Sequence, residues 1–304
     1  MIITILGATA TGKTNLAVAL ALEIGGEIIS ADSRQVYRGM DIGTGKDLSE
    51  FSINGISIPY HLIDIAEPGT EYNVFQYQKD FNETHSKIIK QSRKPILCGG
   101  TGLYLEAALG LHSYPEVPVN YKLRDDLKEK DLNELGVILS NLKPLHNTSD
   151  SLSLERCLRA IEIELYKKEN PEKFIIQPKN AVVFGIKFDR KTLRDRITNR
   201  LMFRLKNGML EETIALIEDY GVSPEKLKYY GLEYKYLTLY YLNEINYEEM
   251  VSQLNTAIHQ FAKRQETWFR GMETKKNLKI HWIDGHWPES RKMDFIKQIL
   301  ENSY

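Results

Sequence analysis

The sequence contains few cysteines, no long apolar run and almost no net charge. Cys98 and Cys157 are the only cysteines among the 304 residues and match no metal-ligand spacing, which argues against a disulfide scaffold and a zinc site and suits a reducing cytosol. No apolar run approaches the roughly 18 residues that a membrane span needs. The chain begins directly with a predicted strand, so we expect neither a membrane partner nor a cleaved signal. Because the formal net charge is −1, any basic surface must be local.

A phosphate-binding loop follows the first predicted strand. Residues 7–14 fit the pattern G-x-x-x-x-G-K-[ST] between an apolar strand and a helix. In such a loop, backbone N–H groups and the helix N-terminus face a phosphate chain, Lys13 reaches the outer phosphates, and the Thr14 hydroxyl is a ligand for Mg²⁺. The predicted loop consists of Gly7, Ala8, Thr9, Ala10, Thr11, Gly12, Lys13 and Thr14. The loop alone leaves open which phosphates bind and whether a phosphoryl group moves.

The order of the predicted elements indicates the fold. Apolar strands alternate with helices up to about residue 112, and a core-type strand returns at residues 181–188. This order predicts an α/β fold of the P-loop NTPase type, with a parallel sheet covered by helices on both faces. Between these parts, residues 113–178 are bounded by prolines and are helical in period, so we predict a helical insertion. The catalytic core is then formed by residues 1–112 and 179–304.

Two further features lie where the strands of such a sheet end. Asp32 follows the second strand, at the edge where open α/β sheets build their sites. A carboxylate there can hold Mg²⁺ through water or accept a proton, and it can equally cap a helix, so the residue type leaves the role open. Asp64 ends another apolar stretch, and we favour a structural role for it. The turn at residues 99–102 is glycine-rich, but a tight strand-to-helix connection explains it better than a second anion site.

Basic residues gather in two C-terminal helices. Arg196, Arg200 and Arg204 are spaced i, i+4 and i+8, so they share one helix face and are candidates for a clamp on phosphates, although most such faces are merely solvated. Residues 262–270 mix cations with an aromatic pair. That mixture suits either nucleic-acid binding or an amphipathic helix that packs Trp268 into the core, and by itself the second interpretation is favoured.

Taken together, these stretches resemble the tRNA dimethylallyltransferases, which prenylate an adenine beside the anticodon. The resemblance extends over nearly the whole chain in colinear order, and the runs at 32–44 and 263–270 are specific to that family. The matching segments are 7–14, 32–44, 61–65, 99–104, Arg196 and Arg200 with Gly208, and 262–265 with Thr267, Trp268 and Arg270.

The resemblance implies an enzyme whose P-loop holds the diphosphate of dimethylallyl diphosphate and not ATP. The adenine N6 would attack the allylic carbon, and diphosphate would leave. Asp32 matches the family's base, while Lys13, the loop N–H groups, Mg²⁺ and Arg200 would neutralise the leaving group, with Arg196 beside them. Thr14 would contact Mg²⁺ or the diphosphate, and Thr101 would help to orient Asp32 or the phosphates.

The resemblance also implies a set of RNA contacts. The insertion would recognise the anticodon stem-loop, and the adenine would leave its stack to reach the site. We further expect a cytoplasmic monomer. The residues expected to bind tRNA are Asp32, Ser33, Arg34, Gln35, Glu155, Arg156, Arg159, Tyr234, Lys235, Lys263 and Arg264.

The chain departs from the family pattern in two places. Glu233 stands where the family has a glycine before the tyrosine. The stretch before Arg156 is Asp150 to Glu155 instead of an Asp-Pro type. Both departures lie in segments that are expected to contact RNA. The residues that are expected to bind the diphosphate keep the family pattern.

Three other functions compete with tRNA prenylation. A prenyltransferase acting on free adenine nucleotides would share the site, but it would not need the spread of basic residues at 156–159 and 263–270. A P-loop small-molecule kinase shares the loop and an aspartate on the second strand, and the helix at 194–204 would have to serve as its lid. A catalytically silent tRNA-binding module would not require Lys13 and Asp32, both of which are present.

Overall fold

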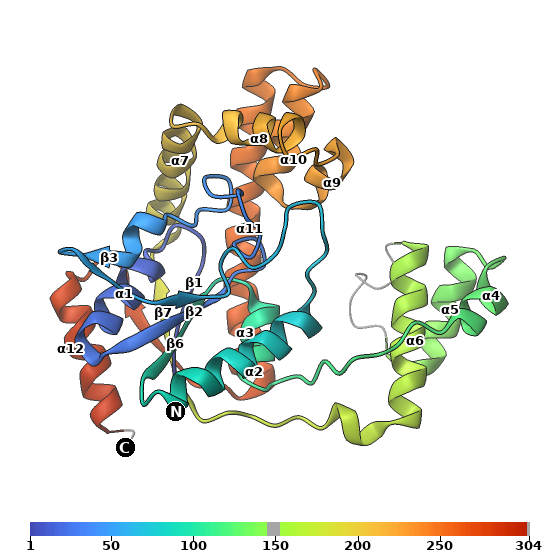
Figure 1. Cartoon of the computed structure of the whole chain (residues 1–304), viewed down its shortest axis with the longest axis horizontal. Coiled ribbons are helices and arrows are strands. Elements are labelled where there is room, and N and C mark those ends of the chain that lie inside the picture. The colour runs from blue at the N-terminus through green and yellow to red at the C-terminus, as the bar shows by residue number, and fades with distance from the viewer. Residues whose placement is uncertain (145–152, 303–304) are drawn as a thin grey trace. The chain divides into compact units, whose positions relative to one another are not determined.

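The structure, a computed structural model, describes residues 1–144 and 153–302 (Figure 1). The chain divides into two compact units, Met1–Leu111 with Pro178–Tyr304 and His112–Gln177. The sequence analysis expected the insertion at residues 113–178. Each unit has its own hydrophobic core.

A six-stranded parallel sheet forms the centre of the first unit. Its strands lie in the order β5-β2-β6-β1-β7-β8, and every neighbouring pair is parallel. The bounds are β1 Ile2–Gly7, β2 Gly26–Ala31, β5 Tyr60–His61, β6 Lys94–Gly99, β7 Ala181–Lys187 and β8 Ile280–Asp284. A separate antiparallel hairpin joins β3 Ser52–Ile53 to β4 Ile56–Ser57. The predicted α/β fold with a parallel sheet is therefore confirmed.

Helices flank the sheet and continue into a mostly helical C-terminal part. The helices of the first unit are α1 Lys13–Ile24, α2 Val74–Lys90, α3 Gly102–Ala108, α7 Arg190–Lys206, α8 Met209–Glu218, α9 Pro224–Tyr229, α10 Leu232–Tyr241, α11 Tyr247–Lys276, α12 Glu289–Glu301 and the short 3₁₀ helix η1 Leu48–Phe51. Helix α9 was not predicted. It begins at a proline, with the Ser223 side chain capping it. Within the described ranges, no helix is both long and apolar enough to cross a membrane.

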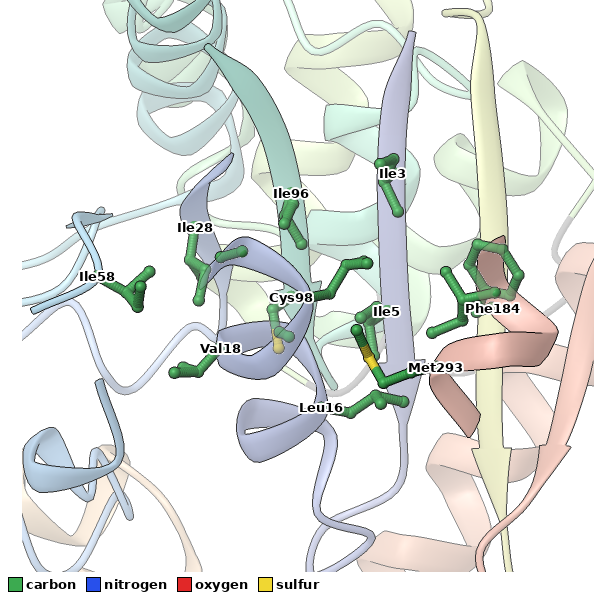
Figure 2. Close-up of a cluster of buried hydrophobic side chains, with 14 of the residues drawn as sticks. Ile3, Ile5, Leu16, Val18, Ile28, Ile58, Ile96, Cys98, Phe184 and Met293 are labelled. Carbon is green, nitrogen blue, oxygen red and sulfur yellow. The ribbon is translucent and has the colours of Figure 1, made fainter. Parts of the chain in front are cut away.

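Alternate residues of the strands build the core on one face of the sheet. Ile3 and Ile5 of β1 and Ile96 of β6 point to the same side, because successive side chains of a strand face opposite ways. Figure 2 shows them packed with Leu16 of α1 and Met293 of α12. All five side chains are buried. This packing fixes the sheet so that β1, β2 and β6 end at one edge, where their loops meet.

The stretch at residues 61–65 contributes little to the sheet. Only Tyr60–His61 forms a strand, and Leu62 and Asp64 have φ angles of 60° and 56°. The irregular path places the Asp64 carboxylate against the ammonium of Lys46, which is fully buried and also lies 2.6 Å from Asp41 Oδ1. A buried lysine requires such partners. Asp64 therefore has the structural contact that the sequence analysis favoured.

The second unit is a small helical body. It contains α4 Tyr121–Leu127, α5 Leu132–Leu142, α6 Leu154–Glu169 and the 3₁₀ helix η3 Pro171–Phe174. Residues 122–142 are helical in period but do not form one continuous helix, because α4 ends at Leu127 and α5 begins at Leu132. Asp131 starts a new helix there, because its side chain and that of Glu134 form a reciprocal capping box. Of the stretch from Asp150 to Glu155 that departs from the family pattern, residues 150–152 lie outside the described residues.

Candidate active site

The loops at the carboxyl edge of the sheet surround a cavity of about 780 Å³. The P-loop, the segment after β2, the turn after β6 and helices α7, α10 and α11 all contribute to its wall. Five residues to which the sequence analysis gave catalytic roles share this wall, and they are Lys13, Thr14, Asp32, Thr101 and Arg200. The volume suits a small ligand that is largely enclosed by protein.

The P-loop has the backbone shape of an anion cradle. Gly12 caps α1 with φ 81°, a conformation that glycine adopts without strain, and the helix starts at Lys13. The Thr11 hydroxyl donates to the Ala8 carbonyl at 2.9 Å and holds the loop closed. Burial lowers the pKa of Lys13, and Arg200 lowers it further, so its charge is costly until an anion arrives. The loop is therefore prepared to receive a group with several negative charges.

Gln265 ties the P-loop to the turn after β6. Its Oε1 accepts from the Thr9 N–H at 2.8 Å, and its Nε2 donates to the Gly100 carbonyl at 2.9 Å. The sequence analysis included Gln265 in a matching segment without giving it a role. A signal was available, because Gln265 lies on the same face of α11 as the buried residues Ala262 and Phe269. A polar side chain at such a position needs partners in the core.

Asp32 lies at the end of β2, and one of its oxygens is committed to the local turn. Asp32 Oδ1 accepts from the Arg34 N–H at 2.9 Å, and no helix follows that it could cap. The Thr101 hydroxyl accepts from the Ser33 N–H at 3.1 Å and so holds the same segment from the turn after β6. The Gln35 amide binds the Gly45 carbonyl at 3.0 Å. The second carboxylate oxygen of Asp32 is left for a ligand in the cavity.

Helix α7 brings its arginines to the P-loop and the cavity wall. Arg196 Nε donates to the Ala10 carbonyl at 2.8 Å, and Arg200 contacts the Thr9 hydroxyl. Arg204 is buried and pairs with Asp47 at 2.8 Å. Burial and the neighbouring Arg204 lower the pKa of Arg200 to about 10. The i, i+4, i+8 face predicted from the sequence is thus the face that lines the cavity, and it forms a row of guanidinium groups beside the P-loop.

The segment at the start of α10 contributes one buried and one exposed candidate. Tyr234 is buried, and its hydroxyl donates to Glu212 Oε1 at 2.7 Å. The two oxygens of Glu212 also accept the backbone N–H groups of residues 41–43, so Tyr234 supports that loop. Lys235 is exposed. Glu233, which precedes them in the chain, lines the cavity.

Aromatic side chains from α11 form part of the cavity wall. The sequence had favoured a helix that packs Trp268 into the core. Trp268 is 43% exposed and Phe261 is 38% exposed, and both line the cavity. Trp268 Nε1 donates to Glu106 Oε1 at 2.9 Å, which fixes the indole. Arg264 lies over the Phe261 ring, whereas Lys263 is exposed and does not line the cavity. The expectation that Trp268 packs fully into the core was therefore wrong.

The candidates at residues 155–159 belong to the second unit. Glu155 and Arg156 are exposed on α6. Arg159 instead bonds Glu162 at 2.9 Å and the Val117 carbonyl at 2.7 Å. Glu162 is buried and also binds Arg124 at 2.7 Å, and these partners hold the pKa of its carboxyl below the usual range although burial opposes them. Arg159 thus stabilises the insertion.

Comparisons with known proteins point to one family. A family model described as IPP transferase matches residues 35–272, and one described as isopentenyl transferase matches residues 1–56. The chain is 53% identical over 301 residues to tRNA dimethylallyltransferase 2 of Bacteroides fragilis, covering 99% of this chain and 98% of that one. It is also 53% identical to tRNA dimethylallyltransferase 1 of Parabacteroides distasonis, with the same coverage.

Solved structures show the same architecture. The full-length tRNA isopentenylpyrophosphate transferase of Bacillus halodurans superposes with a TM-score of 0.72 at 30% identity, covering 99% of this chain and 96% of that one. A eukaryotic dimethylallyltransferase acting on tRNA superposes with a TM-score of 0.81 over 99% of this chain and 79% of that one. At 23% identity, this second likeness bears on the fold alone.

Proposed function

The chain belongs to the IPP transferase family, and we propose that it transfers a dimethylallyl group from dimethylallyl diphosphate to N6 of the adenine on the 3′ side of a tRNA anticodon, with release of diphosphate. The relatives named above, at 53% identity over nearly the full length of both chains, carry the name of this activity. The observation that carries the proposal is the single cavity that the P-loop, Arg200 and Asp32 share.

The cavity offers separate groups for the two halves of the reaction. A C–N bond forms between N6 and the allylic carbon, the bond from that carbon to the diphosphate oxygen breaks, and one proton leaves N6. The free oxygen of Asp32 is the acceptor for this proton, and Thr101 holds its segment in place. Lys13, the loop N–H groups and Arg200 neutralise the charge that grows on the diphosphate.

The donor set also suits Mg²⁺ bound together with a diphosphate. Among the described residues, no group of three His, Cys, Asp or Glu side chains could hold a metal alone. Mg²⁺ commonly keeps water ligands and binds through substrate phosphates with only one or two protein oxygens. Thr14, in the first turn of α1 and on the cavity wall, provides such an oxygen. When bound, the ion would add positive charge to the leaving group.

The wall of aromatic and basic residues on α11 supports a nucleobase acceptor. An adenine that has left its stack needs an apolar face and hydrogen-bond partners. Trp268 and Phe261 offer faces on the cavity wall, and Arg264 lies beside them. In the insertion, we propose that exposed residues of α6, with Arg156 among them, contact the anticodon stem-loop.

A transfer assay tests the function and the acceptor together. Labelled dimethylallyl diphosphate and Mg²⁺ are incubated with unmodified tRNA, and parallel reactions contain AMP, ADP or ATP instead. We expect label in tRNA alone, and no label in tRNA whose adenine 3′ of the anticodon is replaced by guanine. Label in a mononucleotide would overturn the tRNA acceptor. Consumption of ATP without transfer of label would instead indicate a kinase.

A further inference from the structure

The carboxyl group of Glu233 lies beside the arginines of the diphosphate site. It is the second residue of α10 and lines the large cavity together with Arg200 and Arg204. The same three side chains also border a separate void of about 10 Å³. Across residues 1–144 and 153–302, Glu233 forms no ion pair and no hydrogen bond to another side chain, and its carboxyl interacts with its own backbone N–H. Its neighbours are thus cations that it does not bind directly.

Glu233 interacts electrostatically with Arg200, Arg204 and Asp32. Burial raises the pKa of the Glu233 carboxyl, its own backbone N–H and then the two arginines lower it, and Asp32 raises it. Glu233 in turn raises the pKa of Arg200, although burial and Arg204 keep that pKa below its ordinary value. Because water is partly excluded, these interactions are screened less than on an open surface. A diphosphate that reaches Lys13 and Arg200 therefore also meets the Glu233 carboxylate beside its positive partners.

We propose that Glu233 is a built-in counter-charge to Arg200 and Arg204 that weakens the binding of diphosphate and thereby favours release of the diphosphate product. The inference rests on the proposed function, because it requires the P-loop and Arg200 to hold a diphosphate. Inorganic diphosphate carries more negative charge than the prenyl ester, so the repulsion acts more strongly on the product than on the substrate. Glu233 would thus be a residue that sets the balance between substrate capture and product release.

The competing explanation is that Glu233 only stabilises α10. A carboxylate in the first turn of a helix interacts favourably with the positive end of the helix dipole. Glu248 provides a matched control, since it is the second residue of α11, is exposed and is absent from the cavity wall. A purely structural role would make Glu233→Gln and Glu248→Gln behave alike toward diphosphate.

Calorimetric titration with inorganic diphosphate and Mg²⁺ tests the inference. We expect the Kd of diphosphate to fall about tenfold in Glu233→Gln and to stay unchanged in Glu248→Gln. Glu233→Gly, which introduces the glycine of the family pattern, removes the same charge and should also tighten binding. The Glu233→Gly variant provides the same test if Glu233→Gln does not fold. In steady-state assays, Ki for product diphosphate should fall while KM for tRNA stays constant.

The outcomes separate the inference from the function on which it rests. Unchanged or weaker diphosphate binding in both Glu233 variants would overturn the counter-charge. Weaker binding would show instead that Glu233 orients the arginines. If the unaltered chain binds no diphosphate, the proposed function itself fails. Transfer to tRNA by the unaltered chain, combined with equal diphosphate affinity in Glu233→Gln, would leave the function intact and reject the inference alone.

Discussion

The active-site cavity and the insertion at residues 112–177 hold their arginines in different ways. In the cavity, Arg200 and Arg204 are withdrawn from water and held against Thr9 and Asp47. In the insertion, Arg124 and Arg159 bond the buried Glu162 and stabilise the unit, whereas Arg156 lies exposed on α6. Fixed, desolvated charges can stabilise charge that develops during a reaction without reorganising. Exposed charges instead attract a polyanion through long-range forces that salt screens. The comparison implies that catalysis depends on the first set and RNA affinity on the second.

Replacing Asp32 with Ala should produce the largest effect. Loss of the proton acceptor is expected to lower kcat by about 10²- to 10⁴-fold, while tRNA affinity stays nearly constant. Single-turnover transfer and filter binding of tRNA, measured on the same preparation, check both parts. Asp32→Asn is the matched variant, because it keeps an oxygen for the Arg34 N–H. An equal loss of tRNA binding would make Asp32 an RNA contact and break the proposed separation of roles.

Arg200→Ala should weaken use of the prenyl substrate. A charge-assisted hydrogen bond to phosphate contributes about 1.5–3 kcal/mol, so KM for dimethylallyl diphosphate is expected to rise about 10- to 100-fold. Lys206→Ala on the same helix is the control, because Lys206 is exposed and does not line the cavity. Steady-state kinetics with each substrate varied in turn give the result. Unchanged kinetics in the diphosphate substrate would remove Arg200 from the clamp.

The decrease of kcat/KM at high pH should reflect deprotonation of the Lys13 ammonium. Burial and Arg200 lower the pKa of its ammonium, so the cation is lost at a lower pH than for an ordinary lysine. Because diphosphate binding needs the cation, kcat/KM for dimethylallyl diphosphate should fall up to tenfold per pH unit above that lowered pKa. Lys13→Arg keeps its charge and should move this decrease to higher pH. The same decrease in both proteins would assign it to another group.

Sequence patterns predicted the edge of the sheet at which the cavity lies, because the residues that mark it are local in the chain. The P-loop spacing and the arginine repeat of α7 each specify a shape within a few residues. Contacts between segments that are distant in the sequence could not be predicted from such local patterns. Gln265 bonds Thr9 across 256 positions, and Glu212 binds the loop at 41–43 from about 170 positions away. The direction in which Trp268 faces depends on Glu106 and Gly102, which no helical period reveals.

The Gln265 tie between the P-loop and the turn after β6 provides a test with a moderate effect. Gln265→Ala leaves the partly buried Thr9 N–H and the buried Gly100 carbonyl without this partner, so stability should fall by about 1–3 kcal/mol. Urea unfolding measures the loss. Gln265→Glu keeps the acceptor for Thr9 and removes the donor to Gly100, so it separates the two bonds. Full stability in Gln265→Ala would show that the loops are held by their own turns.

Arg156→Ala should produce the smallest effect. One phosphate contact on an exposed surface is worth little at physiological salt, so tRNA Kd is expected to rise only a few-fold, and KM for dimethylallyl diphosphate should not change. The sharper readout is the salt dependence, because each lost phosphate contact reduces the slope of log K against log salt by about 0.7–0.9. Arg159→Ala is an informative neighbour, since Arg159 holds Glu162 and Val117 within the insertion. That variant should lower the stability of the insertion as well. An unchanged salt slope in Arg156→Ala would move the RNA contact to other residues.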